Sequence, residues 1–277
     1  METAFIPTLR NGEIAYELIR RSDGTSLGTY IKKKGEFLDS AYLKETDVSE
    51  HFNNFLLSAA ATVLDPVDID VSQAELIRQY ELKLQAAFEM KAARMPASSE
   101  EVMKRRFERC VEWIRSTDFY RCPASTQYHE SHPFGLLQHS LKVFNKTLEL
   151  LRLPSFADVD ISSAVLCSLT HDWCKIGNYE EYMRNVKNEQ TGKWEQVPSY
   201  RLNMTSLTLG HGVTSMFLVS RFLNLTPEEA AAIRWHMGHW RVTPSEESEL
   251  QRCNEIYPLV HLVQFADQLA ITEYGNK

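Results

Sequence analysis

Residues 170–177 of the chain place two potential metal ligands and a cation close together. His171 directly precedes Asp172, and both follow an apolar run at residues 164–169 that is typical of a buried helix. Neighbouring side chains on a helix point about 100° apart, so the imidazole can hold one metal ion while the two carboxylate oxygens bridge to a second. Lys175 lies three residues after Asp172, which returns its ammonium group to the same face, where a metal-bound phosphate would sit.

The His-Asp pair indicates a metal site only in combination with four further potential ligands. A single histidine is more often a core or surface residue than a ligand, and a His-Asp pair is also typical of a helix end with a capping carboxylate. Asp267, however, stands in an apolar helix predicted at residues 257–271, where a carboxylate is costly to bury unless it is paired or coordinated. Imidazole nitrogens combined with carboxylate oxygens suit Mn, Fe, Co, Ni or Zn. The six expected metal ligands are His139, His171, Asp172, His211, His236 and Asp267.

The segments that carry these donors are predicted to be helical. His139 lies inside a predicted helix over residues 135–151, and His211 lies between two glycines at the start of the next apolar helix. His236 lies on a helix that begins with a Thr-Pro cap at residues 226–227. The fold class is therefore expected to be mainly α.

Two stretches of the chain are predicted to form strands. Residues 14–19 and 30–32 flank an Asp-Gly turn and favour a short strand pair. Residues 182–187 and 193–197 favour a β-hairpin inserted among the helices. Such a hairpin is expected to act as a flap or substrate rim, although a simple insertion without a role fits equally well.

The first part of the chain is expected to form a smaller N-terminal region. Helices are predicted at residues 48–64 and 72–94, and a Pro- and Ser-containing linker at residues 95–99 precedes another helix. We therefore expect an N-terminal α(+β) region at residues 1–96, of unknown role, and a second domain at residues 97–277. The N-terminal region can shape the pocket, form a homo-oligomer or bind a partner.

The composition of the chain limits the kinds of molecule that it is expected to bind. The chain has 277 residues, of which 43% are hydrophobic and 24% charged, as in a soluble globular protein. Its formal net charge is −7, which argues against broad electrostatic binding of duplex nucleic acid. A nucleotide or a short oligonucleotide held by metal ions remains compatible with this charge.

The cysteines and the chain start indicate a cytoplasmic protein. The five cysteines include no Cys-x-x-Cys pair, so reduced thiols are expected, and Cys174 is interpreted as a packing residue. The N-terminus lacks the features of a signal peptide, and no apolar run approaches the roughly 20 residues needed to cross a bilayer. No membrane association is expected.

The order of the donors resembles that of a known family. The segments GLLQHS, HDWCKIG, LGHG, RWHMGH and FADQ follow one another as in the HD superfamily of metal-dependent phosphohydrolases, named for its His-Asp pair. The resemblance covers about residues 118–272 and implies an HD-domain helical bundle with a β-hairpin insertion. More narrowly, the chain is similar to a bacterial and prophage group of HD proteins that shares DFxxxPASTxYH and IRWHMG. The layout of that group is similar to the HD domain of 3′-to-5′ exoribonucleases.

The resemblance implies two divalent transition metal ions. One would be held by His139, His171, Asp172 and Asp267, and the other by Asp172, His211 and His236.

Two departures from the family pattern bear on the number of ions. Met237 follows His236 where the family often has a second histidine, and Gln138 stands where many relatives have an acid. Both departures favour two ions over three and leave His239 as an outer group near the substrate. The nucleic-acid-binding barrel of the exoribonucleases is not expected in the N-terminal region, which weakens that narrower assignment.

The implied activity is hydrolysis of a phosphate ester in a nucleotide or short oligonucleotide by a metal-activated hydroxide. A phosphodiesterase, nucleotidase or nuclease would each fit. The expected catalytic residues are Lys175, Asp172 and His129, and the expected substrate contacts are Lys175, Arg184, Lys187 and His239. For His129, Arg184 and Lys187, an ordinary surface hydrogen bond is the competing interpretation.

Two other functions fit the same ligands. Some HD relatives use a di-iron centre to activate oxygen, and Lys175 is the feature that favours phosphate chemistry instead. A non-catalytic module that binds a nucleotide and signals through the N-terminal region is the third possibility.

Overall fold

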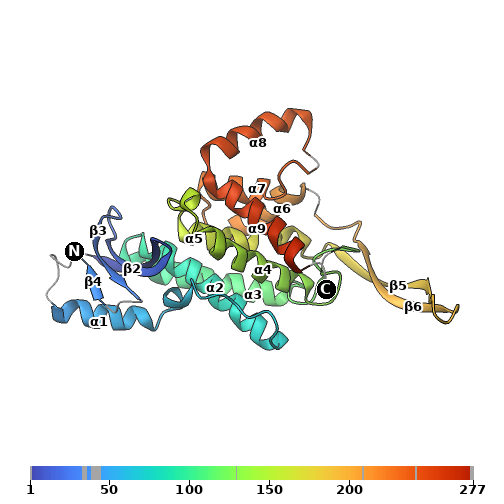
Figure 1. Cartoon of the computed structure of the whole chain (residues 1–277), viewed down its shortest axis with the longest axis horizontal. Helices are drawn as coiled ribbons and strands as arrows, with labels where there is room; N and C mark the ends of the chain where they lie inside the picture. Colours follow the sequence, from blue (N-terminus) through green and yellow to red (C-terminus); the bar gives the residue numbers. More distant parts are fainter. Residues whose placement is uncertain are drawn as a thin grey trace.

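The computed structural model describes residues 2–32, 36–38, 45–128, 130–207, 209–240 and 242–274. Within these ranges the chain forms nine α-helices and two small antiparallel sheets, which confirms the mainly α fold class. Figure 1 shows the four-stranded sheet at one end, the helices in the middle and the two-stranded hairpin projecting at the other end. The helices are α1 (Glu45–Leu56), α2 (Gln73–Ala93), α3 (Glu100–Ser116), α4 (Gly135–Leu150), α5 (Ile161–Thr170), α6 (His211–Ser220), α7 (Pro227–Trp235), α8 (Pro244–Ile256) and α9 (Pro258–Tyr274).

The N-terminal sheet is a meander packed against α1. The predicted strand pair around the Asp-Gly turn is present as β2 and β3, and β1 and β4 extend the sheet on either side. Phe5, Tyr16 and Leu18 are buried together with Phe52 of α1, so the sheet and this helix share a small apolar core. The strands are β1 (Thr3–Arg10), β2 (Glu13–Arg20), β3 (Ser26–Ile31) and β4 (Glu36–Leu38).

The helix predicted over residues 48–64 is interrupted in the structure. α1 ends at Leu56, and a short 3-10 helix follows at Ala59–Thr62. The interruption is stabilised by α2, because Lys83 Nζ donates to the carbonyl of Thr62 at 2.6 Å and to that of Asp65 at 2.7 Å. Glu89 of α2 also accepts a hydrogen bond at 3.0 Å from the backbone nitrogen of Ala60, which a continuous helix would have paired with the carbonyl of Leu56.

α2 is a central helix of the molecule. Ser72 caps it as predicted, with its Oγ 3.3 Å from the backbone nitrogen of Glu75. The predicted apolar stripe, which comprises Leu76, Tyr80, Leu84 and Phe88, is buried in the large core that also includes α4, α5, α7 and α9. α2 therefore packs with the helices that follow the expected boundary at residue 96.

The predicted hairpin is formed by β5 (Tyr179–Lys187) and β6 (Trp194–Leu202), paired along their full length. It leaves the helical part at Tyr179, and in Figure 1 it extends away from all of the helices. Within the part of the chain that the structure describes, no helix combines the length and the apolar character required to cross a lipid bilayer.

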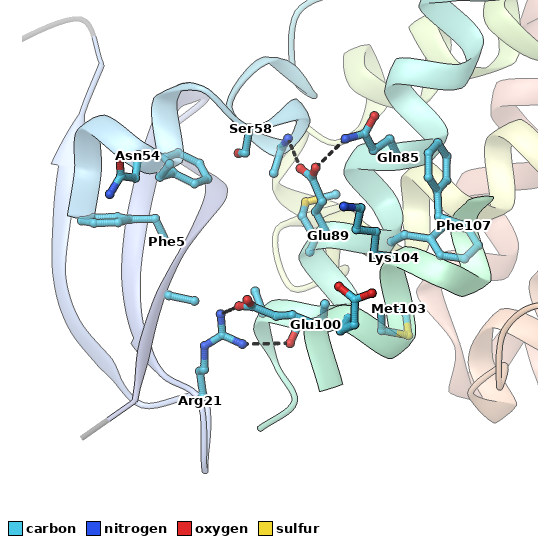
Figure 2. Close-up of a pocket in the computed structure, with 18 of the residues that line it drawn as sticks. Phe5, Arg21, Asn54, Ser58, Gln85, Glu89, Glu100, Met103, Lys104 and Phe107 are labelled. Carbon is cyan, nitrogen blue, oxygen red and sulfur yellow. Dashed lines mark hydrogen bonds and ion pairs between the residues drawn. The ribbon is translucent and has the colours of Figure 1, made fainter. Parts of the chain in front are cut away.

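A pocket of about 700 Å³ lies where the N-terminal sheet and α1 meet α2 and α3 (Figure 2). Phe5 and Phe107 contribute apolar walls from opposite sides, as Figure 2 shows. Two pairs of polar side chains lie inside it: Glu89 accepts a hydrogen bond from Gln85, and Arg21 forms an ion pair with Glu100. None of the six expected metal ligands lines this pocket.

A buried carboxylate joins α2, α5 and α7. Glu229 of α7 is fully buried, accepts a hydrogen bond from Ser163 of α5 at 2.7 Å and forms an ion pair with Lys91 of α2. Its second oxygen accepts from the backbone nitrogen of Thr226 at 2.9 Å, which completes a capping box at the start of α7. A buried charge is tolerated only when it is paired and hydrogen-bonded, and Glu229 meets both conditions.

Replacing Glu229 by alanine is expected to lower the free energy of unfolding by about 3–5 kcal/mol, because Lys91 and Ser163 would lose their partner in the interior. Urea titration followed by circular dichroism measures the change. Arg115→Ala, which breaks an exposed ion pair with Glu81, is the matched control and should cost no more than about 1 kcal/mol. Equal losses for the two variants would contradict a stabilising role for the buried network.

Candidate metal centre

Five elements bring the six expected ligands together in the interior. His139 comes from α4, His171 and Asp172 directly follow α5, and His211 is the first residue of α6. Five of the six are at most 5% exposed, and only the side chain of His211 is open to solvent, at 29%. The remaining two ligands are His236, directly after α7, and Asp267 on α9.

The sequence had suggested one continuous helix around the His-Asp pair, but the structure shows that the helix ends there. α5 ends at Thr170, and Asp172 has φ −104° and ψ 18°, outside the helical region. A 3-10 turn at Trp173–Lys175 follows. This turn still brings Lys175 back to Asp172, because a 3-10 helix places residues three apart on the same side.

Asp172 lies at the centre of the cluster. Its Oδ2 is 3.4 Å from Nε2 of both His139 and His171. Its Oδ1 is 2.8 Å from Nε2 of His211 and 3.4 Å from Nε2 of His236. Each carboxylate oxygen thus faces two imidazoles.

Asp267 completes the half of the cluster that contains His139 and His171. Its Oδ1 lies 3.1 Å from Nε2 of His139 and 3.9 Å from Nε2 of His171. The two imidazole nitrogens are themselves 3.3 Å apart. These three residues offer ligand atoms within 4.8 Å of one another, as do His171, Asp172 and His236, so buried groups of this cluster can hold a metal ion.

Backbone carbonyls orient two of the imidazoles. Nδ1 of His171 lies 2.8 Å from the carbonyl oxygen of Ser168, and Nδ1 of His236 lies 2.7 Å from that of Ile233. A carbonyl can only accept, so each Nδ1 carries the proton and each Nε2 presents a lone pair to the cluster. The buried Nε2 of His236 makes no hydrogen bond within the described residues, which is costly unless a cation satisfies it. The donor set therefore fits a divalent metal ion.

Nearby positive groups keep the two buried carboxylates ionised. Burial alone would raise the pKa of Asp172, but Lys175, whose Nζ lies 2.6 Å from Oδ2, and the adjacent histidines hold that pKa well below its usual range. Burial also opposes ionisation of Asp267, and contact with His139 lowers its pKa. The pKa of His139 shifts in the opposite direction. Burial favours its neutral ring, but Asp172 and Asp267 raise its pKa to about 9. Burial lowers the pKa of His171 and of His211, which favours the neutral rings that can bind a metal ion.

Cys174, interpreted from the sequence as a packing residue beside the His-Asp pair, is buried against the cluster. Its Sγ is 3.4 Å from Nδ1 of His211, and together with Asp172 these two residues form a third group of potential ligands. Burial raises the pKa of the Cys174 thiol, so the protonated form that packs against the ring is favoured over the thiolate that binds metals. Its position two residues after Asp172 was the sequence signal for this contact.

The hairpin carries two expected substrate contacts away from the cluster. Arg184 and Lys187 are exposed residues of β5, five and eight residues beyond Tyr179. A strand rises about 3.3 Å per residue, so they lie roughly 16 and 26 Å along the strand from Tyr179. The structure does not bring them to the phosphate position expected beside Lys175.

His239, another predicted substrate contact, is not part of the cluster. His239 is 65% exposed, and its Nδ1 lies 2.9 Å from Oε1 of Glu247 in a surface ion pair. The turn after α7 directs this side chain outwards, whereas His236 at the helix end faces the other histidines. His129 lies outside the residues that the structure describes.

A close contact between α6 and α7 positions His211. A Cβ on Gly212 would lie 2.0 Å from the carbonyl oxygen of Arg234, so only glycine allows the two helices to approach this closely. Gly210, directly before α6, has a φ of 91° that other residues rarely adopt. The glycines on both sides of His211 thus serve the approach of α6 to the cluster.

The chain matches no protein-family model, no curated protein and no solved structure.

The wild-type protein is expected to retain at least one transition metal ion per chain after reconstitution, and His171→Ala combined with Asp172→Ala should remove it. Elemental analysis by mass spectrometry measures the metal, and circular dichroism checks that the helices remain. His239→Ala is the matched control, since its imidazole lies outside the cluster and its loss should leave the metal content unchanged. Equal metal content in the double variant and the wild type would rule out this cluster as the site.

Gly212→Ala should weaken metal binding without removing any ligand. The added methyl group would push α6 away from Arg234 and carry His211 with it, at a stability cost of about 1–3 kcal/mol. Competition with a chelator reports the affinity. Gly192→Ala is the control, because its φ of 69° strains the hairpin turn and not the cluster. An unchanged metal affinity in Gly212→Ala would show that the helix contact does not position His211.

Proposed function

We propose that the chain is a metal-dependent phosphohydrolase of the HD type, which cleaves a phosphate ester in a nucleotide or short oligonucleotide. The observation that carries this proposal is the position of Asp172. Its two buried oxygens each face two imidazoles, and the ammonium group of Lys175 lies beside them. A carboxylate between two sets of nitrogen donors is the arrangement that a pair of divalent ions requires.

The proposed division of ligands follows the two oxygens of Asp172. Two donors of one ion with bonds of about 2.1 Å at right angles lie about 3 Å apart, close to the 3.1–3.4 Å separations among Asp267, His139 and Asp172 Oδ2. The first ion would be held by His139, His171, Asp172 and Asp267, and the second by Asp172, His211 and His236. Mn, Fe, Co, Ni and Zn all accept such nitrogen and oxygen donors.

Divalent ions bound here would supply Lewis acidity toward water and offset the charge of a phosphate group. The chain itself contributes the fixed positive charge of Lys175 and the bridging carboxylate of Asp172. His211 is the most exposed of the six ligands, so substrate would approach from the start of α6. Tyr179 at the base of the hairpin is close to Lys175, and burial raises its pKa to about 12, which keeps its hydroxyl a neutral donor.

The nucleotide part of the proposal rests on the resemblance of the five ligand-bearing segments to HD phosphohydrolases. The mainly α fold and the hairpin between His171 and His211 agree with the arrangement that this resemblance implies. The choice between a phosphomonoester and a phosphodiester is left to experiment.

A substrate screen tests the proposal directly. Mononucleotides, cyclic nucleotides and short oligonucleotides would be incubated with the protein and Mn, Co, Ni or Mg, and the products separated by chromatography. We expect metal-dependent release of a hydrolysis product from at least one substrate class. Turnover in none of them, with metal bound, would overturn the hydrolase proposal. Iron-dependent oxygen consumption would indicate the di-iron oxygenase, and tight nucleotide binding without turnover would indicate the binding module.

Lys175→Met should lower kcat/KM by about 10²-fold or more while the metal content stays near that of the wild type, because a charge beside the phosphate is lost. Lys187→Met is the matched control, since it removes the same group from the far end of β5 and should leave kcat/KM unchanged. Equal effects of the two substitutions would contradict a role for Lys175 at the phosphate.

A further inference from the structure

A second, smaller hollow lies between α3 and the end of α6. It has a volume of about 140 Å³, and three of the six residues that line it are arginines. Small-molecule sites usually measure about 300–1,000 Å³, so this hollow suits a single small group and not a whole nucleotide. We call it the arginine pocket; it is lined by Arg106, Arg109, Ser220, Arg221, Phe222 and Asn224.

The arginine pocket carries uncompensated positive charge. No carboxylate lines it, and among the residues that the structure describes no ion pair involves Arg106, Arg109 or Arg221. The residue directly before Arg106 on α3 behaves differently, because Arg105 pairs with Glu101 at 3.1 Å. Three adjacent cations without an acid are unusual in a chain whose net charge is −7, where carboxylates are the more abundant charged groups.

Aromatic contacts hold one wall of the pocket in place. The guanidinium carbon of Arg221 lies 5.1 Å from the ring centroid of Trp113, which in turn contacts Phe222 at 5.3 Å. Arg106, Arg109 and Trp113 recur at intervals of three and four residues, so they share one stripe of α3 that faces the end of α6. Stacking of this kind restricts the guanidinium before any ligand arrives and so reduces the entropy lost on binding.

We propose that the arginine pocket binds a phosphate group. Planar guanidinium forks recognise phosphate oxygens through paired hydrogen bonds, and three of them match the charge of a phosphate better than that of a single carboxylate. The group would come either from free phosphate and mononucleotides or from the backbone of an oligonucleotide.

The proposed site is separate from the metal centre and does not depend on the activity proposed above. His211 is the first residue of α6 and Arg221 directly follows its last, so ten residues place them about 15 Å apart along the helix axis. An oligonucleotide that occupied both sites would have to extend at least that far.

Binding measurements on the full-length protein test the proposal. The probes are a fluorescein-labelled eight-nucleotide oligothymidylate, followed by anisotropy, and inorganic phosphate and AMP, followed by calorimetry. Each titration is repeated with EDTA, which removes metal ions and with them any binding at the metal centre. Arg106→Ala combined with Arg109→Ala should weaken binding by about tenfold or more, with or without EDTA, as expected for the loss of charge-assisted hydrogen bonds.

The matched control is Arg105→Ala combined with Arg115→Ala, which removes the same charge from α3 at two residues that already have acidic partners. It should change the affinity by no more than about twofold. Loss of oligothymidylate binding alone would assign the pocket to a nucleic-acid backbone, and a parallel loss of phosphate and AMP binding would assign it to free phosphate. Wild-type affinity of the pocket variant for every probe, or an equal loss in the control, would overturn the proposal.

Discussion

Burying an ionised carboxylate in a protein interior costs free energy unless several partners compensate its charge. Asp172 is such a buried carboxylate, and it lies at the centre of the candidate metal site. Its compensation comes from four imidazoles and one ammonium group supplied by α4, α6, α7 and the turn after α5. These elements have to converge on one point for the carboxylate to be tolerated. The convergence of these elements at Asp172 thus meets one electrostatic requirement, while the apolar core packs the helices around it.

Close convergence of helices needs residues that permit it. Gly212 lets α6 approach the backbone of α7, and Glu229 ties α7 to α5 and α2 through a buried network. Tyr80 of α2 donates a hydrogen bond to the carbonyl of Leu169 at 2.9 Å and accepts one from Trp173 at 3.0 Å, on either side of the His-Asp pair. α2 therefore supports the metal centre, although it precedes the linker that the sequence marks as a boundary.

The two proposed sites would recognise phosphate in different physical ways. The metal centre is buried, and its donors attract cations that can in turn attract phosphate. The arginine pocket lies at the surface and offers positive charge directly. Trp113, which supports the arginine pocket, contacts Trp173 at 5.4 Å, and Trp173 directly follows Asp172. One aromatic contact thus joins the packing around the two sites.

The sequence by itself determined the identity of the donors and most of the elements that carry them. Apolar periodicity and caps predicted α2, α3, α4 and α7, because these signals are local and depend on neighbours three or four residues away. The order of histidines and acids likewise indicated which residues could act as ligands. The division of the helix expected at residues 48–64 was missed, because the segment after the break is held by Glu89 and Lys83 of another helix.

Only the tertiary structure decided which of the chemically suitable residues share a site. His236 and His239 are three residues apart, yet one faces the cluster and the other pairs with Glu247 at the surface, because α7 ends just before them and the chain turns. Arg184 and Lys187 follow Lys175 closely in sequence, but an extended strand carries them away from it. The arginine pocket brings together residues more than 100 positions apart, and no local sequence pattern predicts this proximity. Residue type is local information, whereas proximity depends on packing across the whole chain.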